Sequence, residues 1–260
     1  MLSKMVIEGK GHAPVSGLLT EASSPSCLLV LGHGAGAPMT HHWMEALAEA
    51  LAGEGISTLR YNFQYTEAGR RRPDPVSRLV NVVASALLAG RACADGLPLL
   101  AGGKSMGGRM TSTLVAEQAR PAGGSGERGV GIPAGLVFFG FPLHAPGRRE
   151  SVRGEHLMRV RCPMLFHQGT RDRLADLDLL RALLERVGPR ARLHVLDGGD
   201  HSLTMLKRSG RSLEDVLEEV ARVTAQWAAG VPGGAGGPTV SVTAGSHPGG
   251  PLPAVPAGPS

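Results

Sequence analysis

Aromatic residues are scarce in this chain: five Phe, two Trp and two Tyr make up 3% of its 260 residues. Its core must therefore be built mainly from Leu, Val, Ala and Met. Charged residues are also few, at 19%, whereas hydrophobic residues reach 42%. This balance is typical of a globular protein rather than of a disordered or membrane chain, and the length suits one domain with a substantial core.

Cysteine is nearly absent, with three residues and no CxxC spacing. Cys27 and Cys162 lie in or beside apolar runs, as buried thiols do, so neither a disulfide framework nor a zinc site is indicated. No HExxH or other metal-ligand spacing occurs either. We therefore expect no metal and no cofactor.

The sequence also shows no pattern typical of a targeting signal. Its first residues, MLSKMVIEGKGHAPV, contain no signal-peptide stretch, and no apolar run approaches the length of a membrane span. The net charge is +5, but the arginines are scattered, often beside Asp or Glu, without a basic helix face. We expect a cytoplasmic protein with no membrane or nucleic-acid partner, and the oligomeric state stays open.

The last thirty or so residues differ from the rest. From Gly230 to Ser260 the segment is rich in Pro, Gly and Ala and has no formally charged side chain. Such a segment buries too little apolar surface to offset the entropy of ordering it. The sequence predicts one domain over residues 1–229 and a disordered tail over 230–260.

Short apolar runs alternate with helical patterns through the domain. The runs are nearly continuous, as in parallel strands that are covered on both faces. Expected strands are Cys27–Leu31, Ile56–Tyr61, Leu97–Ala101, Gly135–Phe139, Met164–His167 and Leu193–Leu196, and the first twenty residues add one or two edge strands. This alternation predicts an α/β fold with a mostly parallel sheet between helices. Functional residues then gather at the carboxyl ends of the strands.

The helical patterns carry their own end signals. Thr40 is the expected N-cap of the first, which ends before Gly53, and Gly188 stops the helix that follows the strand Met164–His167. The last helix opens at Ser212, with an acidic residue three positions later in a capping-box pattern.

A GxSxG motif around Ser105 follows the predicted strand Leu97–Ala101. It would hold the hydroxyl on a sharp strand-to-helix turn, where a Cβ on either side would collide. With 38 glycines in the chain, about 0.4 copies arise by chance, so the motif alone does not exclude a glycine-rich turn. An apolar strand before it and a helical pattern after it favour a nucleophile.

Two further segments could stabilise an oxyanion. Gly34, Ala35 and Gly36 follow the strand Cys27–Leu31, where acyl-transfer enzymes of this architecture donate a backbone N–H to the developing charge. The residue after the nucleophile, Met106, would donate the second N–H. A plain turn at a strand end would explain the Gly-rich loop equally well.

Candidates for acid and base also follow strands. Asp172 comes after Met164–His167 and could hold a histidine in the required tautomer, or could simply cap the next helix. His201 follows paired glycines after Leu193–Leu196, and its neighbour Asp200 has poor reach toward its ring. The chain order Ser…Asp…His, each at a strand end, is the order of α/β-hydrolases.

Over roughly residues 3–228 the chain thus resembles the α/β-hydrolase superfamily. The stretches GHGAGAPM, RYNFQYTEAGRRRPDP, GGKSMGGRM and GGDHS are similar to those of a narrower family, the small hydrolase-like proteins of the KANL/Tex type, distantly similar to dienelactone hydrolases. This resemblance implies an eight-stranded sheet and carries Ser105, Asp172 and His201 over as a triad. It names no substrate. Some animal relatives are thought to be parts of protein complexes, which keeps a binding module without turnover as the alternative.

The surroundings of the site are less defined. Arg70, Arg71 and Arg72 either recognise an anion near the site or form a solvated loop that pairs with Asp74 and Glu67. Residues 41–43 either line the mouth of the site or only begin a helix.

Roughly two dozen residues separate the strands Gly135–Phe139 and Met164–His167, too few for a large cap domain. We expect an open site, shaped in part by Phe141.

Together these patterns predict a serine hydrolase of carboxylesterase type (EC 3.1) with a small-molecule acyl substrate. Ser105 would attack the carbonyl, His201 would take its proton, and water would release the acyl group. Acyl transfer to another nucleophile and peptidase action use the same residues and stay open.

Overall fold

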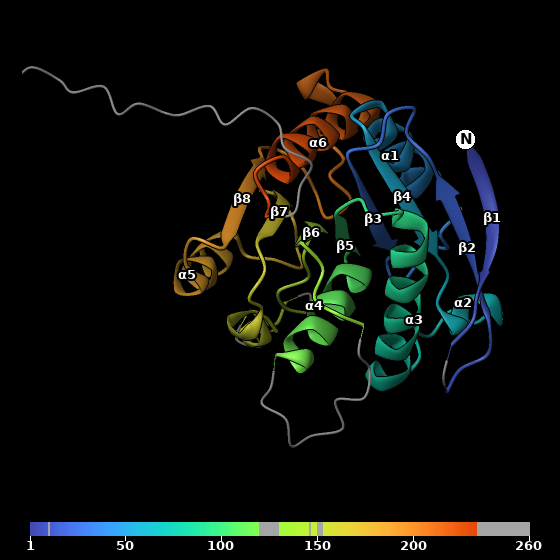
Figure 1. The fold of residues 1–260 in the computed structure, drawn as a ribbon. Coiled ribbons are helices and arrows are strands. Elements are labelled where there is room, and N and C mark those ends of the chain that lie inside the picture. Colours follow the sequence, from blue (N-terminus) through green and yellow to red (C-terminus); the bar gives the residue numbers. More distant parts are fainter. Residues whose placement is uncertain (10, 120–129, 146, 150–152, 233–260) are drawn as a thin grey trace, which may run out of the picture.

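Eight strands form one sheet in the order β1-β2-β4-β3-β5-β6-β7-β8 (Figure 1). The computed structural model describes residues 1–9, 11–119, 130–145, 147–149 and 153–232. The strands are β1 (Leu2–Ile7), β2 (Val15–Thr20), β3 (Cys27–Gly32), β4 (Ile56–Tyr61), β5 (Leu99–Lys104), β6 (Gly135–Phe139), β7 (Met164–Gly169) and β8 (Ala191–Leu196). β2 pairs antiparallel with both neighbours, and the pairs from β4 to β8 are parallel. The predicted mostly parallel sheet is confirmed.

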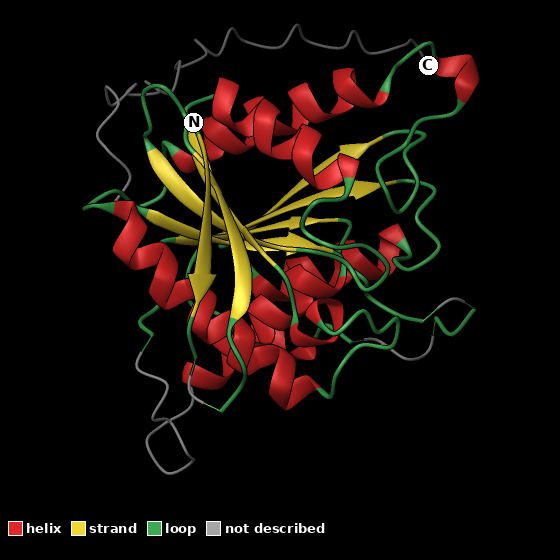
Figure 2. Cartoon of the chain, turned by 90° about the vertical axis from the view of Figure 1, so that its right-hand side faces the viewer, coloured by secondary structure: helices red, strands yellow, loops and turns green. Residues whose placement is uncertain are grey.

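Helices cover both faces of this sheet (Figure 2). They are α1 (His42–Gly53), α2 (Gln64–Glu67), α3 (Val76–Ala94), α4 (Met106–Gln118), α5 (Leu177–Val187) and α6 (Leu213–Ala228), with short 3-10 turns at Glu155–Arg159 and Lys207–Ser209. One hydrophobic cluster joins α3, α4 and α5 to the sheet, and a second joins α1 and α6 to the opposite face.

Strand β3 shows how the sequence pattern produces these two layers. All six of its residues are buried. Leu28 and Val30 belong to the cluster under α3 and α4, whereas Leu29 and Leu31 belong to the cluster under α1 and α6. Successive side chains of a strand point to opposite faces, so a strand covered on both sides needs a continuous apolar run.

The strand order places the site. After β3 the chain adds β4 on one side, and it then crosses to β5 on the other side of β3. Loops that leave the carboxyl ends of β3 and β5 therefore diverge, which opens a crevice at this switch point. Ser105 follows β5 and the Gly34–Gly36 loop follows β3, so both predicted elements lie at this crevice.

The predicted strands Ile56–Tyr61 and Gly135–Phe139 have the observed bounds, and the other predicted strands differ at one or both ends by one to three residues. Gly188 ends α5, and Ser212 opens α6 with a complete capping box. Thr40 as N-cap of α1 is wrong: His41 is the cap, and its Nδ1 accepts from the backbone N–H of Trp43 at 3.2 Å.

Most of the predicted tail, from residue 233 onward, lies outside the described residues, but Val231 within it is described and buried against the fold. Helix α3 is long and apolar enough to cross a membrane by length and composition alone. Half of that stretch is buried inside the fold, as in a core helix, and α3 packs against β3 and α4.

Three histidines with buried or half-buried side chains make the fold sensitive to acid. Burial lowers the pKa of His33 and of His156 to about 4 and that of His167 well below its usual value. The unfolded chain therefore binds more protons than the folded chain between pH 6.5 and 4, so stability is lost as the pH falls through this window.

We expect the free energy of unfolding, measured by urea titration, to fall between pH 7 and pH 5. Each histidine contributes at most about 1.4 kcal/mol per pH unit. His156→Gln should flatten this slope, because the protonation site is gone. Equal slopes for the wild type and the His156 variant would contradict this account.

Candidate active site

Ser105 occupies the tight turn between β5 and α4, with φ 49° and ψ −112°. Positive φ is rare for a residue with a side chain and indicates local strain. The neighbouring glycines explain how the turn fits. A Cβ on Gly103 or on Gly107 would lie 2.3 Å from the carbonyl oxygen of Gly32. Only glycine lets these backbones approach so closely, so the GxSxG spacing has a steric cause.

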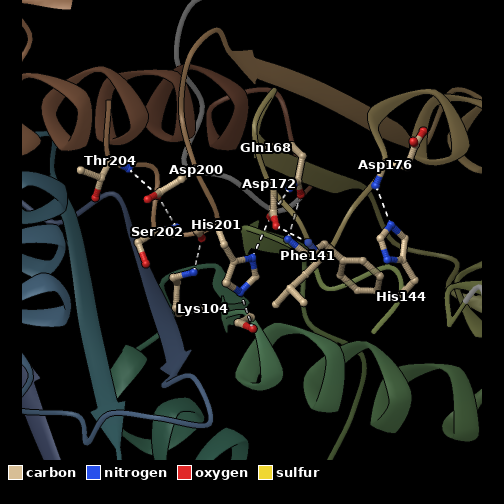
Figure 3. A network of polar contacts seen from close by, with 12 residues as sticks. Lys104, Phe141, His144, Gln168, Asp172, Asp176, Asp200, His201, Ser202 and Thr204 are labelled. Atoms are coloured by element: carbon tan, nitrogen blue, oxygen red, sulfur yellow. Dashed lines mark hydrogen bonds and ion pairs between the residues drawn. The ribbon is translucent and has the colours of Figure 1, made fainter. Parts of the chain in front are cut away.

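The structure brings the three predicted triad residues together. His201 Nε2 lies 2.9 Å from Ser105 Oγ, and His201 Nδ1 lies 2.7 Å from Asp172 Oδ2 (Figure 3). The Asp172 side chain is buried, while that of His201 is one quarter exposed. The carboxylate can only accept, so Nδ1 carries the proton and Nε2 is left to accept from the serine hydroxyl.

Buried hydrogen bonds fix the orientation of Asp172. Its Oδ2 accepts from Gln168 Nε2 at 2.5 Å, and its Oδ1 accepts from the backbone N–H of Leu174 at 2.7 Å. The other end of the same amide, Gln168 Oε1, accepts from the N–H of Phe141 at 2.9 Å (Figure 3). The alternative role of Asp172 as a helix cap does not apply, because Asp176 caps α5.

His144 joins the loop after β6 to the loop that carries the acid. Its backbone N–H donates to the carbonyl of Leu174, and its Nε2 accepts from the N–H of Asp176, both at 2.9 Å (Figure 3). Sequence reasoning missed both Gln168 and His144. A polar residue inside an apolar strand was the available signal for Gln168.

The Gly34–Gly36 loop lies against the nucleophile: a Cβ on Gly34 would be 3.7 Å from Ser105 Cβ. Hydrogen bonds from His33 and Tyr65 hold the carbonyls of this loop in place. Gly34 O accepts from His33 Nδ1 at 2.7 Å, and Ala35 O accepts from the hydroxyl of Tyr65 at 3.1 Å. In a trans peptide the next N–H points opposite to the carbonyl. The N–H groups of Ala35 and Gly36 are therefore directed away from Tyr65.

His33 is itself fixed in one tautomer. Its Nε2 accepts from the backbone N–H of Phe63 at 3.2 Å, and burial lowers its pKa to about 4. The ring is neutral near pH 7, with the proton on Nδ1, where it reaches Gly34 O. Met106 begins α4, so its N–H has no acceptor within the helix.

A pocket of about 530 Å³ opens at the nucleophile. It is lined by Gly34, Ala35, Gly36, Ala37, His41, His42, Trp43, Met44, Lys104, Ser105, Leu174, His201, Ser202, Thr204 and Leu213. Ser105, His201 and the three loop residues predicted for the oxyanion thus share one cavity. Residues 41–43 both begin α1 and line the mouth, so their two interpretations are compatible.

The structure does not bring the remaining predicted residues to this pocket. Phe141 is 1% exposed and packs edge-on against Phe138 and Phe166, so its side chain belongs to the core. Its backbone N–H, not its ring, serves the site. The expectation that its side chain shapes the pocket is corrected accordingly.

The arginine loop also lies apart from the pocket lining. Arg70 pairs with the buried Asp74 at 2.8 Å, as the solvated-loop alternative expects, and Arg71 and Arg72 are exposed. Glu67, the other proposed partner, instead accepts from the backbone N–H of Ser16.

Lys104 is a pocket residue that sequence reasoning overlooked. It precedes Ser105, is 9% exposed, and donates from Nζ to the carbonyl of His201 (Figure 3). Its Nζ also lies 5.6 Å from the ring centroid of Trp43. Burial lowers the pKa of the ammonium to about 8. Among the described residues no cluster of His, Cys, Asp and Glu could hold a metal.

Gln168→Leu should lower the free energy of unfolding by about 2–4 kcal/mol, because two buried groups lose their partner, the N–H of Phe141 and the carboxylate of Asp172. Gln64→Leu is the matched control: that amide makes one solvent-accessible bond, to Ala13 O. We expect the control to cost less than about 1 kcal/mol in urea unfolding. A similar loss in both variants would refute a special role for the Gln168 bridge.

Comparison with solved structures finds the same fold in several hydrolases. An α/β serine hydrolase homologue from Coxiella burnetii superposes with a TM-score of 0.65 at 18% identity, covering 85% of this chain and 96% of that one. A dienelactone hydrolase from Anabaena variabilis gives 0.63 at 18% identity, covering 87% and 96%. A serine hydrolase without lid from Xanthomonas campestris gives 0.64 at 18% identity, covering 89% and 95%.

Curated relatives of this chain are much longer proteins. Two Mycobacterium tuberculosis proteins with a provisional phosphoribosyl transferase name are 26% identical over 223 residues, which is 84% of this chain. The chain spans only 44% of the length of these relatives.

A family model described as an alpha/beta hydrolase domain matches residues 25–229, which include the whole site. This match, together with the sheet order and the tight turn at Ser105, shows that the chain belongs to the α/β hydrolase domain family.

Proposed function

We propose that this protein is a serine hydrolase of carboxylesterase type that cleaves an ester or related acyl bond in a small substrate. One observation carries the proposal: a continuous hydrogen-bonded chain runs from Ser105 through His201 to Asp172 at the wall of a pocket. Membership in the α/β hydrolase domain family supports hydrolase activity.

The reaction follows from the proton positions. Ser105 Oγ attacks the acyl carbonyl while its proton moves to His201 Nε2, and Asp172 stabilises the resulting imidazolium. The imidazolium then returns the proton to the leaving alcohol as the carbon–oxygen bond breaks, which leaves an acyl-serine. Water, deprotonated by His201, attacks this ester and releases the acid together with the free serine.

Backbone N–H groups would stabilise the negative charge that develops on the carbonyl oxygen of the substrate. Met106 offers an N–H at the start of α4, and Ala35 or Gly36 offers another from the facing loop. Donors fixed in advance cost no reorganisation during the reaction, which makes them effective. No cofactor enters these steps.

The pocket favours a small substrate. A volume of about 530 Å³ is in the range of small-molecule sites. The described part of the segment between β6 and β7 contains one 3-10 turn and no α-helix.

The phosphoribosyl transferase name belongs to proteins more than twice the length of the matched region, so it is not carried over.

We expect a fluorophosphonate probe to label the wild-type protein on Ser105. Labelling and hydrolysis of 4-nitrophenyl acetate should fall by about 10³-fold or more in Ser105→Ala, His201→Gln and Asp172→Asn, because the triad acts as a unit. Asp200→Asn is the matched control, since that carboxylate accepts only from nearby backbone N–H groups.

Heat-denatured protein should not be labelled. A folded wild-type protein that neither reacts with the probe nor turns over any short-chain ester would overturn the proposal and favour a binding module.

Tyr65→Phe should lower kcat on 4-nitrophenyl acetate by about 10-fold with little change in KM, because the freed Ala35 carbonyl lets the oxyanion donors tilt. Tyr61→Phe is the control: its buried hydroxyl makes no hydrogen bond to Gly34 or Ala35. Equal kcat values in the two variants would show that the hydrogen bond from Tyr65 to the Ala35 carbonyl does not affect the reaction.

A further inference from the structure

Lys104 places a buried positive charge in the wall of a pocket that contains no carboxylate. The side chain lines the cavity beside Ser105, together with Ala35, Ala37, Trp43 and Leu213. None of the lining residues is acidic. A cation that leaves water for such a place loses solvation, which is tolerated only when nearby groups compensate.

The compensation visible in the structure is partial. An ammonium has three N–H donors, and one of them reaches the carbonyl of His201, while the ring of Trp43 lies 5.6 Å away. Within the described residues, no carboxylate lies within 4.0 Å of Lys104 as an ion pair. Two of its N–H donors have no hydrogen-bond acceptor among the described residues.

The nearest acids are occupied elsewhere. Asp172 and Asp200 act on the Lys104 ammonium through space. Asp172 already accepts from His201 and Gln168, and Asp200 accepts from the backbone N–H groups of Ser202 and Thr204. Neither carboxylate lines the pocket, so the cavity itself holds a cation without a matching anion.

We propose that Lys104 binds a carboxylate carried by the substrate, so that the preferred substrates are acyl esters with an anionic group a few bonds from the scissile carbonyl. This inference rests on the proposed hydrolase function, whose substrate class it names. Consecutive Cα atoms are about 3.8 Å apart, and Lys104 and Ser105 line the same cavity. One small molecule in this cavity can therefore present an anion to Lys104 and a carbonyl to Ser105.

A carboxylate suits this site better than a phosphate. The pocket lining contains one lysine and no arginine. Phosphate sites usually combine several charged donors, often the forked guanidinium of Arg. One ammonium with two available donors matches the single charge and two oxygens of a carboxylate.

The test compares two esters of equal length, mono-4-nitrophenyl adipate and its neutral methyl ester, in the wild-type protein. We expect kcat/KM to be about 10-fold or more higher for the anionic ester, as for one charge-assisted hydrogen bond. A ratio of one or less would overturn the inference.

Lys104→Met should bring this ratio close to one, and Lys104→Arg should retain part of the preference. The ratio is the readout because a displaced His201 loop would slow both esters alike. A Met variant that keeps the wild-type ratio would also refute the inference.

A second measurement needs no variant. Because the pKa of Lys104 is lowered to about 8, raising the pH from 7 to 9 should reduce the wild-type ratio as the ammonium loses its proton. The other titratable groups around it are Asp172, Asp200, His201, His41 and His42, and changes in catalysis itself cancel between the two esters. A constant ratio would assign the preference to another group.

Failure of the hydrolase proposal can be told apart from failure of this inference. Fluorophosphonate labelling reports an activated Ser105 whatever the ester preference. If labelling and turnover are both absent, calorimetry with adipate and neutral adipamide still tests the anion site. Adipate binding that is lost in Lys104→Met would support the site, and no preference for adipate over adipamide would overturn it.

Discussion

Close backbone contact at the crossing of β3, β5, β6 and α4 is the constraint on which the site depends. A Cβ on Gly102 would lie 1.8 Å from the carbonyl oxygen of Val137, and Gly103 and Gly107 both press against Gly32. These contacts bring α4 so close to the sheet that the chain must turn sharply at Ser105. The strained φ of Ser105 is held by this packing. The nucleophile thus lies on a turn whose backbone is fixed by close contacts with β3 and β6.

The other half of the site is held differently, by buried polar groups rather than by close packing. Asp172 and His201 lie on loops after β7 and β8, and loops are free to move unless their backbone groups are tied. Gln168, within β7, extends a bond to Asp172 and another to the N–H of Phe141. In a low-dielectric interior such bonds are strong and an unpaired group is costly, so the network has one stable arrangement. Backbone packing thus fixes Ser105, whereas hydrogen bonds fix the position of His201.

The sequence predicts part of this arrangement, and the reason is geometric. In a parallel sheet the carboxyl ends of all strands share one edge, so Ser105, Asp172 and His201 could be placed near one another from strand ends and chain order alone. Gln168 and Tyr65 could not, because each acts on backbone or side-chain atoms whose proximity depends on the folded loops. Phe141 was misplaced for the same reason: a residue just after a strand can turn into the core or into the pocket, and sequence does not distinguish the two.

Lys104 links the tight turn at Ser105 to the proposed binding of the substrate. The turn that presents Ser105 also fixes the residue before it, and that position faces the cavity with the His201 carbonyl within reach of its ammonium. A neutral side chain of similar length would fill the same space without the desolvation cost of a buried charge. If the fold required only packing here, Met or Leu would serve. A charge retained beside the nucleophile, with two N–H donors that find no protein acceptor, is better explained by a ligand in the cavity than by the packing around it.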